Sequence, residues 1–121
     1  MGPPPIARDL ATQAQLVKSG DTRTRVAATH RVWNLGLAAP DSENKIRAVQ
    51  LLMEPVDSSS DHIRMPAVYA ITEIANSSKD PAVKIAALNA LRAPIVSGQV
   101  PIRDVAIDAV NSIMTNARKS E

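Results

Sequence analysis

The stretch His-Ile-Arg-Met-Pro-Ala-Val-Tyr-Ala-Ile-Thr-Glu-Ile, residues 62–74, decides the fold because a related stretch, residues 101–113, follows thirty-nine residues later. Ile63-Arg64 returns there as Ile102-Arg103. One period earlier the pattern continues in a weaker form, as Thr24-Arg25, Ala28, Val32 and Leu35. A fixed period of this length, with apolar residues at helical spacing, is typical of helical-repeat arrays in which neighbouring units bury each other's apolar faces.

The segments between these stretches repeat on the same period, so that Leu10, Val49 and Leu88 correspond. Helix-capping residues and breakers then predict six helices: about 6–17, 22–38, 42–54, a fourth from the 56–60 loop to Asn76, 81–93 and 101–116. The residues expected to face inward are Ala7, Leu10, Ala14, Val17, Ala28, Val32, Leu35, Ile46, Val49, Leu52, Met53, Ile71, Ile85, Leu88 and Leu91.

Prolines and aspartates mark the expected helix ends. Asp21, Asp41 and Asp80 precede apolar-periodic segments and are predicted N-caps. Pro55 and Pro94 are expected to end the third and fifth helices, because proline lacks an N–H and disfavours helix in the residue before it. Pro66 falls inside the fourth helix, for which Asp61 or His62 is the expected cap, and predicts a slight bend or a later helix start.

This organisation predicts an all-α superhelix, a solenoid of three two-helix units. Residues 1–5 are expected to form a flexible tail and residues 118–121 a polar tail. The single domain between them, residues 6–117, divides into units of about 6–40, 41–79 and 80–117.

The units resemble HEAT repeats, an armadillo-like family, in which the second helix of each hairpin commonly begins with an apolar residue and then Arg or Lys. Ile63-Arg64 and Ile102-Arg103 carry this signature, each followed by a spaced Ala-apolar pattern, whereas the first unit departs from it with Thr24. The resemblance implies a ladder of turn aspartates and helix cations between neighbouring units. Its candidates are Asp21, Arg25, Asp41, Asp61, Arg64, Asp80, Lys84 and Arg103, although helix capping and solvated side chains explain the same residues.

Composition limits the function classes. The 121 residues carry a net charge of +2 with basic and acidic residues interspersed, whereas phosphate binders usually carry a clustered basic face. No apolar run approaches the roughly 20 residues of a membrane span. The chain has no cysteine and its start lacks the features of a signal peptide, so a cytoplasmic location is expected.

Catalytic chemistry has little material here, and we predict no catalytic residue, no cofactor and no metal. The histidine His62 stands beside Asp61 and near Asp57, but a position at a helix start favours capping over metal coordination. The glycines do not form a phosphate-binding loop.

The repeat aligns exposed positions of the second helices into rows. The predicted partner-binding residues are His30, Tyr69 and Asp108 in one row and Trp33, Thr72 and Asn111 in the next. Tyr69 and Trp33 are the only aromatic residues apart from the histidines, and such residues are enriched among energetically important contacts. Trp33 has an alternative role, covering the edge of the core.

The sequence therefore predicts a non-catalytic scaffold that binds another protein through its second helices. One alternative is a nucleic-acid-binding module that uses Arg23, Arg25, Arg31, Lys45 and Arg47; another is a subunit of a HEAT-like lyase or DNA-repair enzyme. The last helix carries Ile107, Ile113 and Met114 where a terminal unit needs a polar outer face, which suggests self-association through the C-terminal repeat or continuation into a longer protein.

Overall fold

The structure, a computed structural model, describes residues 5–119, and within that range it is helical with no strand. This confirms the all-α prediction. The helices are α1 (Pro5–Leu16), α2 (Thr22–Ala38), α3 (Ser42–Val56), α4 (Asp61–Asn76), α5 (Pro81–Ala90), α6 (Arg92–Ser97) and α7 (Val100–Lys119). None of these helices is long and apolar enough to cross a membrane.

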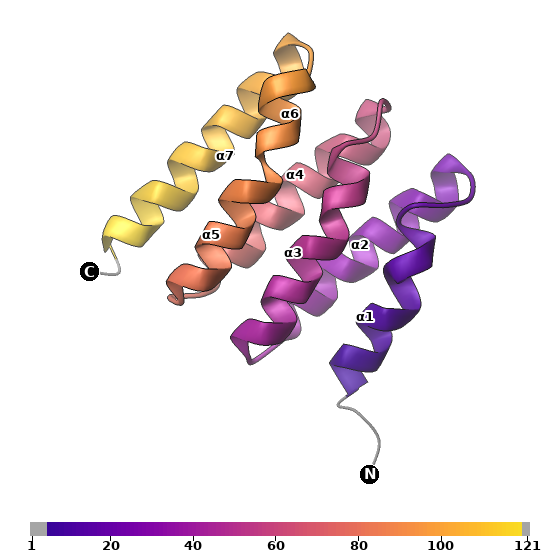
Figure 1. Cartoon of the computed structure of the whole chain (residues 1–121), viewed down its shortest axis with the longest axis horizontal. Coiled ribbons are helices and arrows are strands. Elements are labelled where there is room, and N and C mark those ends of the chain that lie inside the picture. Colours follow the sequence, from indigo (N-terminus) through magenta and orange to yellow (C-terminus); the bar gives the residue numbers. More distant parts are fainter. Residues whose placement is uncertain (1–4, 120–121) are drawn as a thin grey trace.

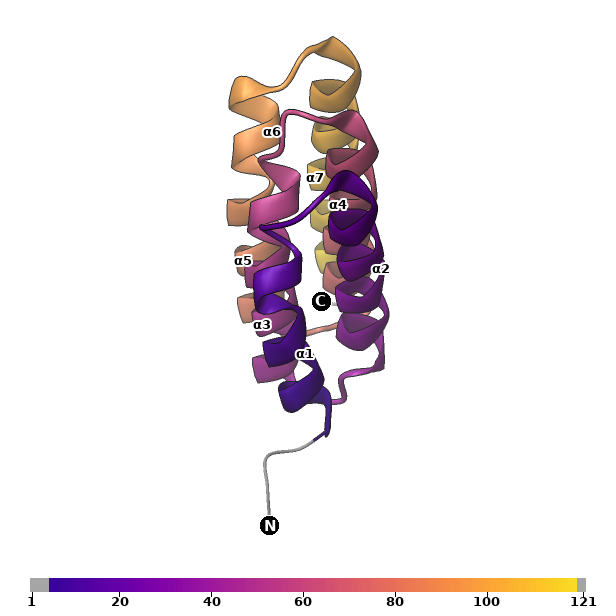
Figure 2. The ribbon, with the colours of Figure 1, turned by 90° about the vertical axis from the view of Figure 1, so that its right-hand side faces the viewer.

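The helices lie in two layers (Figures 1 and 2). One layer contains α1, α3, α5 and α6, and the other contains α2, α4 and α7. Within the first layer α1 packs on α3 and α3 on α5, and within the second α2 packs on α4 and α4 on α7. Figure 1 shows α1 at one end of the molecule and α7 at the other. Elements adjacent in the chain are therefore adjacent in space.

The three predicted aspartate caps are present. Thr24 N–H donates to Asp21 at 2.8 Å, Asn44 N–H donates to Asp41 at 3.0 Å, and Ala82 N–H donates to Asp80 at 2.9 Å. The Thr24 bond lowers the pKa of the Asp21 carboxyl, and the side-chain and backbone bonds from Asn44 lower that of Asp41. Each carboxylate thus satisfies a backbone donor that the helix itself leaves unpaired.

The predicted fifth helix is interrupted, so the structure has a short additional helix where a loop was expected. The break falls at Leu91, and Pro94, predicted to end the fifth helix, lies inside α6. A proline ring clashes with the carbonyl four residues earlier, which here belongs to Ala90. The interruption therefore comes one turn before the proline rather than at it.

The two other internal prolines leave their helices continuous. Pro55 lies within the last turn of α3, which ends one residue later, and Pro66 lies within α4. The cap of α4 is Ser60, and neither Asp61 nor His62, because α4 begins at Asp61 itself. The expectation of a later start was wrong.

The predicted tails are shorter than expected where the structure describes them. Pro5 is the first residue of α1, and Arg118 and Lys119 belong to the last turn of α7. Residues 1–4 and 120–121, the remainder of both predicted tails, lie outside the described residues.

The core lies between the two layers and contains most of the residues predicted to face inward. Leu10, Val49 and Ile71 have no exposed surface. Two assignments were wrong, since Met53 is 46% exposed and Ile85 is 58% exposed. Ile85 lies on α5 and lines a depression between α5 and α7 that is open to solvent.

Gly36 allows the two layers to approach closely. A Cβ built on Gly36 would lie 2.8 Å from Ile74 Cγ1 of α4 and 3.0 Å from Ala48 Cβ of α3. Real side chains avoid such distances, so the absence of a side chain at Gly36 is what lets α2 pack against both helices.

The predicted ladder of aspartates and cations takes a different form. Arg25 Nε donates to the Val17 carbonyl at 3.1 Å, and Lys84 Nζ donates to the Ala75 carbonyl at 3.0 Å. The aspartates Asp21, Asp41 and Asp80 accept bonds at the start of their own helices, and Asp80 also accepts a bond from the Ser42 side chain of α3. Carbonyls at helix C-termini have no helical partner, which makes them acceptors for these buried or half-buried cations.

Candidate partner-binding surface

The six predicted partner-binding residues come from the three helices of one layer. His30 and Trp33 lie on α2, Tyr69 and Thr72 on α4, and Asp108 and Asn111 on α7. Four of them, His30, Tyr69, Asp108 and Asn111, are exposed, and the other two are half-buried. Together with Glu73 of α4 we call these residues the α2–α4–α7 face.

Trp33 combines the two roles that the sequence left open. It is half-buried and packs against the hydrophobic core. Its ring also stacks on His30, with centroids 5.5 Å apart and planes inclined by 21°. Its indole N–H donates to the carboxylate of Glu73, which ties α2 to α4 at the surface. Trp33 is therefore both a cover for the core and part of the exposed surface.

Sequence reasoning missed Glu73. The thirty-nine-residue period aligns Trp33 with Thr72, the neighbour of Glu73, so a signal for the position existed. An indole N–H at the edge of a core requires a hydrogen-bond acceptor, and the sequence analysis did not look for one near Trp33. A search for acidic residues next to each aligned position would have found it.

A groove between α4 and α7 contains three of the predicted residues. The predicted residues in its lining are Tyr69, Thr72 and Asp108. Its remaining lining is Val68, Val105, Ala109 and Ser112. Tyr69 is 50% exposed, so its ring forms an accessible wall over a largely apolar floor. The Thr72 hydroxyl donates to the Val68 carbonyl at 2.8 Å, which fixes its orientation.

Asn111 does not line this groove. It lies in an adjoining recess that also includes Asn76, Thr115 and Lys119. Asn76 Nδ2 donates to Ser112 Oγ at 3.0 Å and so connects α4 to α7 at this point. Asp108 and Ser112 border both depressions, and the apolar groove therefore continues into a polar recess.

The residues considered for metal binding do not assemble into a ligand set. Within residues 5–119 no three His, Cys, Asp or Glu side chains are grouped so that they would hold a metal ion. Asp57, Asp61 and His62 are all exposed near the start of α4.

The five basic residues of the nucleic-acid alternative do not share one surface. Lys45 is buried, and the Nε of Arg25 is bonded to a backbone carbonyl. Arg47 belongs to α3, in the opposite layer from Arg23 and Arg31 of α2. This distribution differs from the clustered basic face that phosphate binding requires.

Comparison of the chain with models of protein families, with curated proteins and with solved structures finds no match in any of the three.

Proposed function

We propose that this chain is a HEAT-like solenoid of three two-helix units that acts as a non-catalytic protein-binding scaffold. In this proposal the partner is held on the α2–α4–α7 face.

The packing order of the helices supports the solenoid part of the proposal. The helix α1 packs on α2 and α3, α3 packs also on α5, and α4 packs on α7. Contacts that pass from each helix to its neighbours along the chain are what a stacked repeat array requires. A closed bundle would instead bring its first and last helices together.

The observation that carries the binding proposal is the arrangement around Tyr69. Its half-exposed ring borders an apolar groove, and Asp108 supplies a carboxylate on the opposite helix. An exposed aromatic residue beside an apolar depression with one charged group at the rim is the arrangement of an interface anchor. Trp33, His30 and Glu73 extend the same face across α2.

The chemistry of the face defines the partner segment. An apolar side chain of the partner would fill the groove between α4 and α7. A basic side chain beside it would pair with Asp108, and the exposed amide group of Asn111 would bond to its backbone. The proposed partner is thus a protein segment with adjacent apolar and basic side chains.

The test compares variants against one purified partner. The immobilised chain is used to capture partners from an extract of its native cell, and the captured protein is then purified and titrated. Tyr69→Ala should weaken binding by about 1 kcal/mol or more, and Asp108→Ala should also weaken it. Met53→Ala, exposed on α3 in the other layer, is the matched control.

Equal affinities of the wild type, Tyr69→Ala and Asp108→Ala would refute the assignment of this face. Circular dichroism of each variant shows whether it is folded, so that loss of binding is not confused with unfolding.

A further inference from the structure

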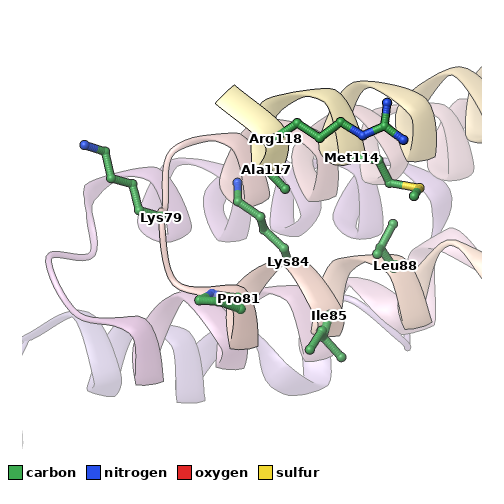
Figure 3. Close-up of a pocket in the computed structure, with 8 residues that line it drawn as sticks. All are labelled: Lys79, Pro81, Lys84, Ile85, Leu88, Met114, Ala117 and Arg118. Carbon is green, nitrogen blue, oxygen red and sulfur yellow. The ribbon is translucent and has the colours of Figure 1, made fainter. Parts of the chain in front are cut away.

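A second depression lies at the C-terminal end of the molecule, between α5 and α7 (Figure 3). Its apolar lining includes Ile85 and Leu88 of α5 and Met114 of α7. Ile85 is 58% exposed and Met114 is 46% exposed, so both side chains present apolar surface to solvent. We call this depression the end groove. It shares no lining residue with the α2–α4–α7 face.

Equivalent positions one period earlier in the chain indicate that a helix is the kind of structure that would cover the end groove. Thirty-nine residues before Leu88 and Met114 stand Val49 and Ala75, and neither has any exposed surface. Their helices, α3 and α4, are covered by α5 and α7, the next helices along the molecule. The residues of the end groove are therefore open to solvent, whereas the equivalent residues one period earlier are covered by helices.

The charge around the end groove indicates the chemistry of what would cover it. Lys79 and Arg118 stand at its rim, and Lys84 lies between them (Figure 3). None of the eight residues that line the groove is acidic. Lys84 is buried and bonded within the molecule, whereas Lys79 and Arg118 are exposed, so these two are the cations accessible to a partner.

We propose that the end groove binds an acidic amphipathic helix of another protein. Apolar side chains spaced one turn apart on that helix would pack on Ile85, Leu88 and Met114. Asp or Glu side chains flanking them would pair with Lys79 and Arg118. Helix-in-groove recognition of this kind takes its affinity from the apolar stripe and its selectivity from the charges.

The same charges disfavour a second copy of this chain as the occupant. A two-fold dimer through the end groove would place Lys79 and Arg118 of one copy near the same cations of the other, because a two-fold interface pairs identical patches. Like charges brought together at an interface cost binding free energy.

The experiment uses synthetic helices as probes. A fluorescent helix-stabilised peptide with a Leu stripe and Glu at the flanking positions is titrated with the full chain by fluorescence anisotropy. The matched control peptide carries Lys in place of each Glu. The acidic peptide should bind, the basic peptide should not, and Lys79→Glu with Arg118→Glu should weaken binding of the acidic peptide by about tenfold or more.

Two further variants make the result specific. Met114→Asp should abolish binding of the acidic peptide, whereas Lys18→Glu, an exposed cation on the loop after α1, should leave it nearly unchanged. Amide resonances that shift on titration should map to α5 and α7 in the wild type.

Several results would overturn the proposal. They are absence of binding by the acidic peptide, equal binding of the two peptides, and shifts that map to α2 and α4 instead. Sedimentation showing a dimer that Met114→Asp dissociates would assign the groove to a second copy. Displacement of the acidic peptide by a short DNA duplex through Lys79 and Arg118 would assign it to nucleic acid.

Discussion

Lys45 and Lys84, thirty-nine residues apart, are both buried and donate to carbonyls that are themselves thirty-nine residues apart. Lys45 Nζ lies 3.0 Å from the Gly36 oxygen, and Lys84 Nζ lies 3.0 Å from the Ala75 oxygen. Each lysine also reaches the other layer a second time: Ser77 Oγ, in the residue that caps α4, accepts from Lys45 at 2.9 Å, and Asn116 Oδ1 of α7 accepts from Lys84 at 2.7 Å. The Lys84 ammonium group therefore links three helices, and that of Lys45 links α3 to α2 and to the C-terminal cap of α4.

Removing the Lys45 ammonium group should destabilise the fold. The helical donor for the Gly36 carbonyl would be the residue four positions on, but this is Pro40, which has no N–H. Lys45→Met preserves the volume and leaves that buried oxygen without the Lys45 bond, which should lower the free energy of unfolding by about 1 to 3 kcal/mol. Urea denaturation measures the change, and Lys18→Met, at an exposed site, is the control. A Lys45→Met protein as stable as the wild type would contradict this role.

The buried lysines should also make stability depend on pH in the alkaline range. Burial lowers the pKa of Lys45 and of Lys84 below the ordinary value of 10.5. Between the lowered pKa and 10.5 the unfolded chain binds more protons than the folded one, so these groups make the folded state relatively more stable as pH rises.

The measurement is the difference in free energy of unfolding between the wild type and Lys84→Met at several pH values. This difference should increase in favour of the wild type as pH rises toward 10.5. A difference that stays flat or decreases through this range would show that the folded pKa is not lowered.

A side chain at Gly36 should be destabilising although alanine favours helix. The gain in helix propensity is about 1 kcal/mol, whereas the new Cβ would press on Ile74 and Ala48 at distances that require the packing to shift. Gly36→Ala should therefore lower the melting temperature. Ile74→Val removes the Cδ1 atom, so the double variant should lose less stability than the two single changes added together. Simple additivity would argue against the contact.

The exposed and buried isoleucines provide a direct contrast. Ile71 has no exposed surface, and Ile71→Ala should cost about 2 to 5 kcal/mol of unfolding free energy. Ile85→Ala, at a side chain that is 58% exposed, should change it by only about 0.5 kcal/mol. Chemical denaturation of both variants tests the placement of the core, and similar costs at the two sites would contradict it.

The bond between Trp33 and Glu73 can be observed directly because the chain has one tryptophan. Glu73→Ala should move the single indole N–H resonance upfield and increase its exchange with water, since the N–H loses its acceptor. Glu54→Ala, an exposed carboxylate at the end of α3, is the matched control and should leave the resonance unchanged. An unaltered resonance in Glu73→Ala would exclude the bond in solution.

Periodicity and capping chemistry predicted most of the helical structure because both act locally. The Asp21, Asp41 and Asp80 caps show this, since each bond spans three residues or fewer. The buried position of Lys45 was not predicted, because a pattern of apolar residues treats every lysine as solvated. Its burial depends on an acceptor in another helix, Gly36, which no local pattern identifies.

The surface was predicted less completely than the fold. The aligned rows brought Tyr69 and Asp108 to one groove, as expected from the period. The same period assigned Ile85 to the core together with its equivalent Ile46, which is half-buried and packs against the core. A repeat of apolar positions does not indicate which of them another helix covers, and Ile85 is 58% exposed.

Duplication of one unit tests the proposed repeat architecture most directly. A second copy of residues 41–79 inserted after Lys79 would place each duplicated helix against neighbours of the same kind. In a stacked array this adds one more interface, so the longer protein should fold with a higher melting temperature and a larger dependence of stability on denaturant. Insertion of a scrambled sequence of the same length is the control. It should give a lower melting temperature and a smaller dependence of stability on denaturant than the duplicated protein. A duplicated protein that aggregates or melts earlier than the wild type would indicate that the helices form a closed set that cannot accept another unit, and the solenoid proposal would then be wrong.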